Sequence, residues 1–85
     1  MALDDDFRSA QDRVKTLRDA PSTDTLLELY ALFKQGSVGD VDGKRPGVFD
    51  VKGRAKWDAW NARKGMTREA AMTAYVALVD RLTRG

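Results

Sequence analysis

Hydrophobic residues near the start of the chain recur three or four positions apart, which is the spacing of an amphipathic helix. The apolar stripe consists of Phe7, Ala10, Val14 and Leu17. An acidic start at Asp4 favours a helix there, because negative charge complements the helix dipole. Pro21 is expected to end the helix, since the residue before a proline is pushed out of helical geometry. We therefore predict a first helix over residues 4–20.

A second stripe with the same period lies at the end of the chain. It consists of Ala71, Met72, Tyr75, Leu78, Val79 and Leu82. Thr67 stands where a helix N-cap is expected, with Glu69 in the first turn. The pattern predicts a last helix whose apolar face lies in the core.

Two further helices are predicted between these stripes. Ser22 begins a group of capping residues, and the helix that follows is expected to reach about Gln35 and to stop at Gly36. Its apolar residues are Leu26, Leu27, Leu29, Leu32 and Phe33. That set is too wide for one narrow stripe, so either all five lie in the core or some face a ligand groove. A shorter helix is predicted over residues 53–64, with Trp57 and Trp60 as core anchors.

The connection over residues 36–51 is long for so small a helical protein, and such loops are usually functional or disordered. It holds Val38, Val41, Val48 and Phe49, which we expect to pack onto the helices. Residues 39–44 imitate a phosphate-binding loop but have three residues between the glycines instead of four. Residues 40–51 imitate a calcium loop but end in valine instead of glutamate. We therefore predict neither a phosphate-binding loop nor a calcium-binding loop in this connection.

Composition narrows the classes of function. The 85 residues suit one domain, predicted to span residues 1–85, and they include no cysteine and no histidine. Histidine-dependent nucleophiles, disulfides and thiolate or imidazole metal sites are therefore excluded. The N-terminus does not resemble a signal peptide, and no apolar run is long enough to span a bilayer. A cytoplasmic protein is expected.

Charge is unevenly distributed along the chain. Residues 1–43 hold 5 Lys/Arg against 9 Asp/Glu, whereas residues 44–68 hold 8 against 2. Within the basic segment, Lys52 and Lys56 share a helix face, and so do Tyr30 and Lys34 in the preceding helix. Aromatic and lysine side chains together suit a ligand with phosphates, a flat base and an apolar tail.

The same region resembles a known family. Residues 34–40 (KQGSVGD), 45–47 (RPG) and 50–61 (DVKGRAKWDAWN) are similar to the signature of the acyl-CoA-binding proteins. The likeness extends from about Asp4 to about Leu82. It implies an all-α four-helix bundle in up-down-down-up order, with one long overhand loop between the second and third helices. It also implies a monomeric, non-catalytic carrier that binds medium- to long-chain acyl-CoA, buffers it and presents it to enzymes of lipid metabolism, without a cofactor or metal.

The resemblance also assigns ligand-binding residues. The acyl-CoA site is expected to comprise Lys15, Leu26, Leu27, Tyr30, Phe33, Lys34, Lys52, Lys56 and Tyr75. Spacing alone would make Lys15 a solvated lysine and Tyr75 a core residue; the resemblance places the Lys15 ammonium and the Tyr75 hydroxyl at the ligand. Phe33 stands in place of a usual tyrosine, Gln11 in place of alanine, and Leu26 in place of methionine. These departures bear on affinity and chain-length preference.

Two other classes of function compete with this interpretation. A nucleic-acid-binding module would use the basic segment, but Asp50 and Asp58 are interspersed among its cations. A thioesterase would need a carboxylate base, and no close carboxylate pair falls in the predicted groove. Neither a nucleic acid nor a catalytic activity is therefore expected.

Overall fold

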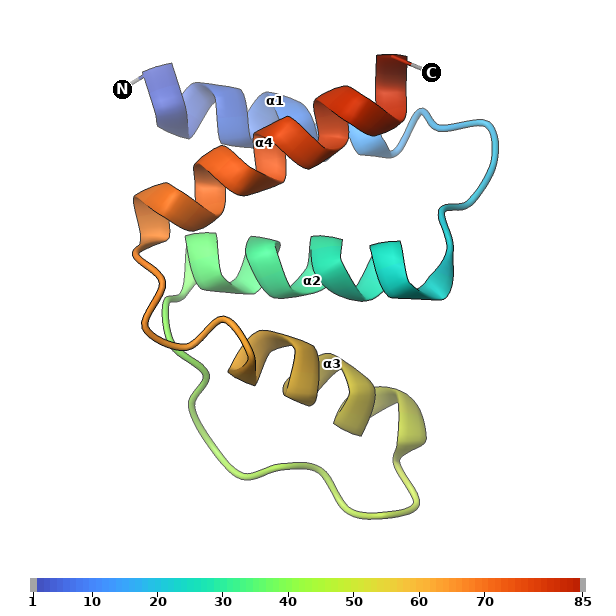
Figure 1. Ribbon diagram of the computed structural model, residues 1–85, viewed down its shortest axis with the longest axis vertical. Helices are drawn as coiled ribbons and strands as arrows, with labels where there is room; N and C mark the ends of the chain where they lie inside the picture. Colours follow the sequence, from blue (N-terminus) through green and yellow to red (C-terminus); the bar gives the residue numbers. More distant parts are fainter. Residues whose placement is uncertain (1, 85) are drawn as a thin grey trace.

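The computed structural model describes residues 2–84 and folds them into four helices (Figure 1). They are α1 (Ala2–Val14), α2 (Thr23–Ser37), α3 (Val51–Asn61) and α4 (Arg68–Arg84). Helices α1 and α4 run in one direction and α2 and α3 in the other, as Figure 1 shows, and a long loop joins α2 to α3. The all-α, up-down-down-up prediction is confirmed.

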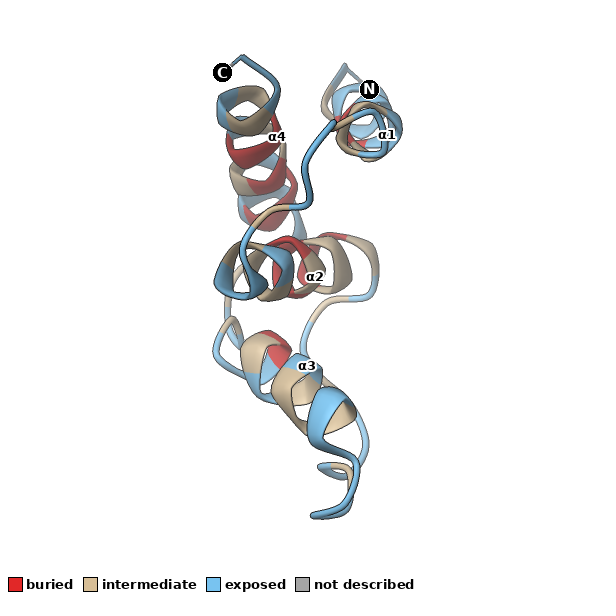
Figure 2. Cartoon of the chain, turned by 90° about the vertical axis from the view of Figure 1, so that its right-hand side faces the viewer, coloured by how far each residue is buried: buried red, intermediate tan, exposed pale blue. Residues whose placement is uncertain are grey.

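The core lies where α1, α2 and α4 meet (Figure 2). It consists of Phe7, Ala10, Leu29, Leu32, Ala71, Met72, Tyr75, Leu78 and Val79. All nine belong to the predicted apolar patterns, but Val14 and Leu82 of the terminal stripes are only partly buried against this core, and Leu17 is also only partly buried. Of the five apolar residues predicted on the second helix, only Leu29 and Leu32 belong to it. Helix α3 packs only against α2 among the described helices, and Trp60 is its one buried residue. Trp57 is only partly buried, so the prediction of two core tryptophans holds for Trp60 alone.

A polar contact inside the fold fastens the connections around α3. Gln35 on α2 is fully buried, and its Nε2 donates hydrogen bonds to Asp40 Oδ1 and to the Met66 carbonyl, both at 2.8 Å. The same Asp40 oxygen accepts the Gly65 N–H at 2.8 Å. One side chain therefore joins the start of the long loop to the α3–α4 connection.

This contact predicts a pH dependence of stability. The hydrogen bonds from Gly65 and Gln35 hold the pKa of Asp40 below its ordinary value of 3.8. A lowered folded-state pKa stabilises the protein above the unfolded-state value, and that contribution is lost as the pH falls through the folded-state pKa. Below about pH 4, the free energy of unfolding should fall more steeply in the unaltered protein than in Asp40→Asn. Urea unfolding at a series of pH values checks this, and parallel curves would contradict it.

Helix α1 ends at Val14, so the prediction that it continues to residue 20 and stops at Pro21 is wrong. The Thr16 hydroxyl donates to the Arg13 carbonyl at 2.7 Å, and the Leu17 N–H bonds to Val14 instead. A threonine side chain that bonds a carbonyl one turn back competes with the helical ladder. The last turn consequently tightens and the helix ends before the proline.

Gly36 does not end α2, contrary to the prediction, because the helix continues to Ser37 and the chain turns at Gly39 with a φ of 100°. Gly36 is instead a packing position. A Cβ atom there would lie 3.1 Å from Phe7 Cζ and 3.2 Å from Met72 Cγ. The missing side chain leaves room for α1 and α4 against α2.

The boundaries of α3 also differ from the prediction. The helix begins at Val51 because the Asp50 carboxylate caps it, accepting the Gly53 N–H at 3.0 Å. It ends at Asn61, and tighter turns lead from there to Gly65, whose φ is 92°. The predicted cap of α4 is confirmed, since Thr67 Oγ1 accepts the Ala70 N–H at 3.0 Å.

The loop between α2 and α3 does not pack as expected. Val38, Val48 and Phe49 are exposed, and only Val41 is partly buried. The loop lies along α3, where the Arg45 guanidinium binds both carboxylate oxygens of Asp58 at 2.8 and 2.6 Å. This polar contact holds the loop against α3. Val38, Val48 and Phe49 do not pack on the helices and lie largely in solvent.

Candidate functional site

A groove of about 370 Å³ lies between α2 and α3. It is lined by Thr23, Leu26, Leu27, Tyr30, Lys52, Ala55 and Lys56. The leucines and the alanine supply apolar surface, and the two lysines supply positive charge from the α3 side. Its volume is within the usual range for small-molecule sites, about 300–1,000 Å³.

Helical spacing on both helices explains how these residues converge. On α2, positions 23, 26, 27 and 30 recur at one turn and two turns, so they share a face. On α3, positions 52, 55 and 56 do the same. Thr23 and Ala55 were not predicted as lining residues. The signal that could have identified them was helical spacing, since Thr23 lies seven residues before Tyr30 and Ala55 three residues after Lys52.

Two lysines bridge the helices by contacts with aromatic rings. Lys56 on α3 places its Nζ 5.5 Å from the centroid of the Tyr30 ring on α2. Lys34 on α2 places its Nζ 4.9 Å from the centroid of the Trp60 ring on α3. Both distances are within the range of cation–π interactions, and these interactions hold the two ammonium groups at the contact between α2 and α3. Trp60 is itself held by a hydrogen bond from its Nε1 to the Gly39 carbonyl at 2.8 Å.

Phe33 and Tyr75 belong to an aromatic cluster instead of the groove wall. Their ring centroids are 6.5 Å apart, and the Phe7 ring lies 6.2 Å from Phe33 and 5.2 Å from Tyr75. Burial raises the pKa of the Tyr75 phenol above its ordinary value of 10.0. The hydroxyl therefore remains protonated at neutral pH and can donate a hydrogen bond.

The structure brings together only part of the predicted site. Leu26, Leu27, Tyr30, Lys52 and Lys56 line one groove. Lys34 and Phe33 lie farther along α2, and Tyr75 lies on α4. Lys15 is exposed in the turn that follows α1 and does not line the groove.

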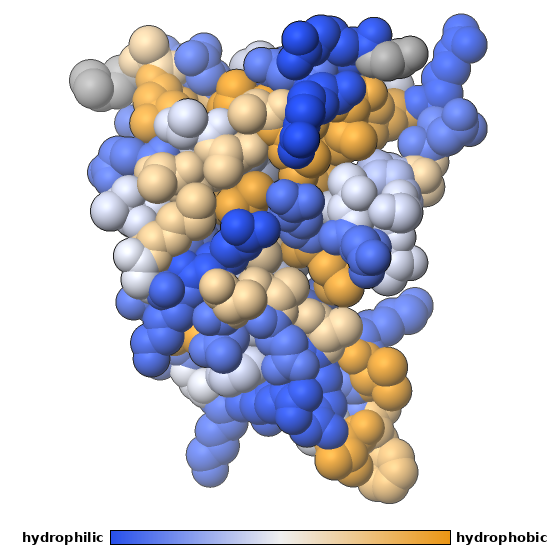
Figure 3. Space-filling view, in the orientation of Figure 1, coloured by the Kyte–Doolittle hydropathy of each residue, from blue (hydrophilic) through white to orange (hydrophobic). Residues whose placement is uncertain are grey.

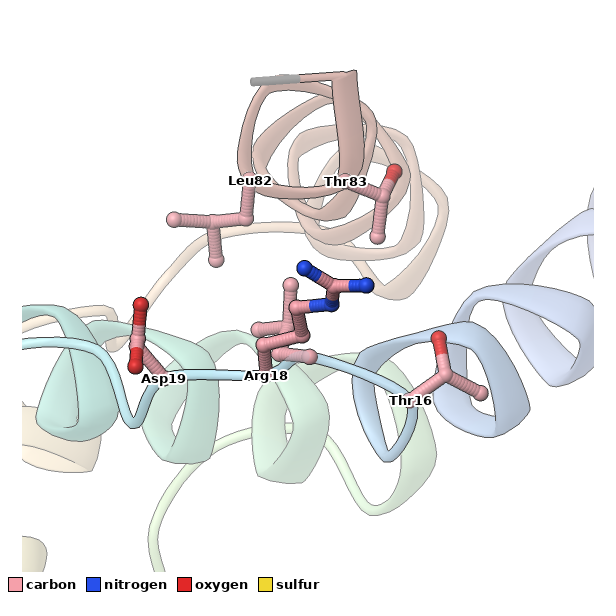
Figure 4. A pocket seen from close by; sticks show the side chains of 6 residues that line it. Thr16, Arg18, Asp19, Leu82 and Thr83 are labelled. Carbon is pink, nitrogen blue, oxygen red and sulfur yellow. The ribbon is translucent and has the colours of Figure 1, made fainter.

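Another cavity, of about 340 Å³, lies between the α1–α2 connection and the end of α4 (Figure 4). Thr16, Leu17, Arg18, Asp19, Leu82 and Thr83 line it. Figure 4 shows the Arg18 side chain extending from the connection toward α4. None of the predicted ligand-binding residues lines it, and Arg18, the one basic residue among its lining, stands next to the acidic Asp19. The groove between α2 and α3 is therefore the better candidate site.

Within residues 2–84, no three His, Cys, Asp or Glu side chains lie close enough together to hold a metal ion. None of the four described helices is both long enough and apolar enough to cross a membrane.

Comparisons with known proteins agree on one family. The model of the family described as "Acyl CoA binding protein" matches residues 4–79. The chain is 57% identical over 76 residues to acyl-CoA-binding protein homolog 1 of Caenorhabditis elegans. The aligned residues make up 89% of this chain and 88% of the relative. The chain is 51% identical over 76 residues to the acyl-CoA-binding protein of Saccharomyces cerevisiae, covering 89% and 87% of the two chains.

Among solved structures, the fold is similar to acyl-CoA-binding protein 2 of Oryza sativa, with a TM-score of 0.95 at 43% identity. That likeness covers 99% of this chain and 91% of the rice chain. The sequence signature, the helix arrangement and the extent of these matches agree. The chain belongs to the acyl-CoA-binding protein family.

Proposed function

We propose that this chain is a high-affinity carrier for medium- to long-chain acyl-CoA esters, which it buffers and transports for lipid metabolism. Family membership makes it an acyl-CoA-binding protein and not an enzyme. The observation that carries the finer proposal is the α2–α3 groove, which combines an apolar floor with lysines along one side. A thioester of coenzyme A has the matching combination of an alkyl chain and phosphates.

The lysines are proposed to bind the phosphates of coenzyme A. Lys34 and Lys56, together with Tyr30, would lie nearest the 3′-phosphate, with Lys52 and Lys15 completing the positive surface. A hydrogen bond to a charged group contributes roughly 1.5–3 kcal/mol. The contacts of Lys34 and Lys56 with aromatic rings support this role, because they hold both ammonium groups near one helix contact.

Aromatic residues are proposed to complete the head-group site. Phe33 would stack on the adenine, a contact worth about 1–3 kcal/mol for a base on an aromatic ring. Tyr75 would donate its hydroxyl to the ligand. One observation supports that second role: burial raises the pKa of the Tyr75 phenol, so that its hydroxyl stays protonated at neutral pH.

Leu26 and Leu27 are proposed to receive the acyl chain. Each methylene fully removed from water contributes about 0.8 kcal/mol, so affinity should rise with chain length until the groove is filled. The match of the family model to residues 4–79 supports a single acyl-CoA-binding domain over residues 1–85. The proposal includes action as a monomer in the cytoplasm.

Calorimetric titration with palmitoyl-CoA, free coenzyme A and palmitate in parallel tests this proposal. The thioester should bind with micromolar or tighter affinity, about −8 kcal/mol or better, and each half should bind much more weakly. The reason is that the groove and the lysines contribute together only when one ligand reaches both. Equal affinity for palmitoyl-CoA and palmitate would contradict the proposed head-group site.

The nucleic-acid alternative is not favoured by the structure. Arg45 is paired with Asp58, and Arg63 Nη2 lies 3.6 Å from Glu28 Oε2. Two arginines of the basic segment are thus paired with carboxylates, whereas a nucleic-acid-binding surface needs its arginines free to contact phosphates.

A further inference from the structure

Three hydrophobic side chains protrude where the long loop enters α3. Val48 is 65% exposed, Phe49 98% and Val51 73%, and together we name them the apolar tip. Figure 3 shows hydrophobic surface at the lower right of the molecule, where this end of the loop lies. In Figure 2 the same segment projects below α3, away from the core. The apolar tip is therefore one of the most remote parts of the molecule from its own hydrophobic core.

The backbone holds the apolar tip in place. The Asp50 N–H bonds to the Gly47 carbonyl at 3.0 Å, closing a turn under Val48 and Phe49. The Asp50 carboxylate then caps α3 through the Gly53 N–H. These contacts hold the chain on both sides of Phe49 while leaving its ring in solvent. Large hydrophobic groups that lie mostly in solvent on an ordered turn suit an external apolar partner.

Positive charge surrounds the apolar tip. Residues 44–56 hold five Lys or Arg against the single acid Asp50. Arg45 is neutralised by Asp58, but Lys44 and Lys52 are exposed and form no ion pair within residues 2–84. Cations interleaved with protruding apolar groups match a surface that is anionic outside and apolar beneath.

We propose that the apolar tip docks on an anionic lipid bilayer. Val48, Phe49 and Val51 would enter the headgroup–acyl boundary, and Lys44 and Lys52 would contact lipid phosphates. A protein partner fits less well, because stable interfaces bury about 800 Å² on each side and this feature is a narrow projection.

The position of the groove gives this docking a consequence. Lys52 directly follows Val51 and also lines the groove, and Leu26 at the groove is half exposed. A docked molecule would thus hold its groove close to the lipid surface. If the groove binds acyl-CoA, the thioester has only a short path between the bilayer and the protein. This consequence depends on the proposed carrier function, whereas the docking itself does not.

Co-sedimentation of ligand-free protein with sucrose-loaded vesicles tests the proposal. Binding should be measurable with vesicles of phosphatidylcholine and phosphatidylserine, and should be much weaker with phosphatidylcholine alone. Phe49→Asp should weaken it by about tenfold or more, because burial of an aromatic side chain is lost. Its matched control is Val38→Asp, an equal change of charge at another exposed apolar residue of the same loop, which should weaken binding far less.

The electrostatic part has its own pair of variants. Lys44→Gln should weaken vesicle binding by about fivefold, the effect expected of one cation near an anionic surface. Arg81→Gln, which removes the same charge from an exposed position on α4, should change it little.

The proposal is overturned if the protein does not bind anionic vesicles, in which case the apolar tip is left to a protein partner. It is equally overturned if each variant behaves like its control, since binding would then follow net charge alone. No acyl-CoA is present in these experiments. A negative result with vesicles would therefore contradict the docking proposal without bearing on the carrier function, which the calorimetric titration tests separately.

Discussion

Replacing Lys56 by alanine is expected to weaken palmitoyl-CoA binding by about 10- to 100-fold, without a comparable loss of stability. Lys56 lines the groove on the α3 side, and its ammonium lies over the Tyr30 ring. In the proposed complex it donates charge-assisted hydrogen bonds to a phosphate, and alanine leaves that phosphate without its partner. Isothermal titration calorimetry with the purified variant measures the effect directly.

Lys64→Ala is the matched control, because it removes the same charge from an exposed lysine beyond the end of α3. Its affinity should remain close to that of the unaltered protein. If both variants lost affinity equally, the basic segment would act only through its overall charge. If Lys56→Ala bound normally, the phosphates would lie elsewhere and the assignment of the groove would be wrong.

Gly36→Leu is expected to lower the free energy of unfolding by about 1–3 kcal/mol, the usual cost of overpacking a filled core. Helix propensity alone predicts the opposite sign, since leucine is favoured over glycine in a helix interior by somewhat under 1 kcal/mol. Packing should outweigh propensity here, because a Cβ at Gly36 already meets Phe7 Cζ and Met72 Cγ at 3.1 and 3.2 Å. Urea unfolding followed by far-UV circular dichroism measures the difference.

Gly47→Leu provides the comparison at a position without packing constraints. Nothing lies within 4 Å of a Cβ built at Gly47, so this change should alter the free energy of unfolding by no more than about 0.5 kcal/mol. Should Gly36→Leu prove as stable as the unaltered protein, the close approach of α1 and α4 to α2 at this point would not be needed for stability.

Several features could be predicted from local sequence. The stripes that contain Phe7 and Tyr75 placed both residues in the core, because three- and four-residue spacing determines a helix face whatever the helix packs against. The cap Thr67 was predicted for the same kind of reason, and Ser22 was one of three adjacent candidate caps, since a side chain that bonds an N–H three residues on acts within one turn. The family signature added the order of the helices and the location of the candidate site.

Other features depended on contacts between distant residues. Gly36 was predicted to end a helix because glycine commonly does so, but Phe7 and Met72, far away in sequence, make it a packing position. Phe49 was expected to pack inward because it is hydrophobic, but the loop lies along α3 and offers it no apolar surface. Neither outcome has a local signal.

The sequence by itself therefore determined that the chain forms four helices, which faces of the terminal helices are apolar, and which family it belongs to. Only the tertiary structure decided where α1 and α2 end, that Lys52 and Lys56 share a groove with Leu26, and that Phe49 lies in solvent. The physical reason is one of range. Helix periodicity and capping act within one or two turns, whereas a groove, a close helix contact or an exposed loop exists only once segments far apart in the chain have packed together.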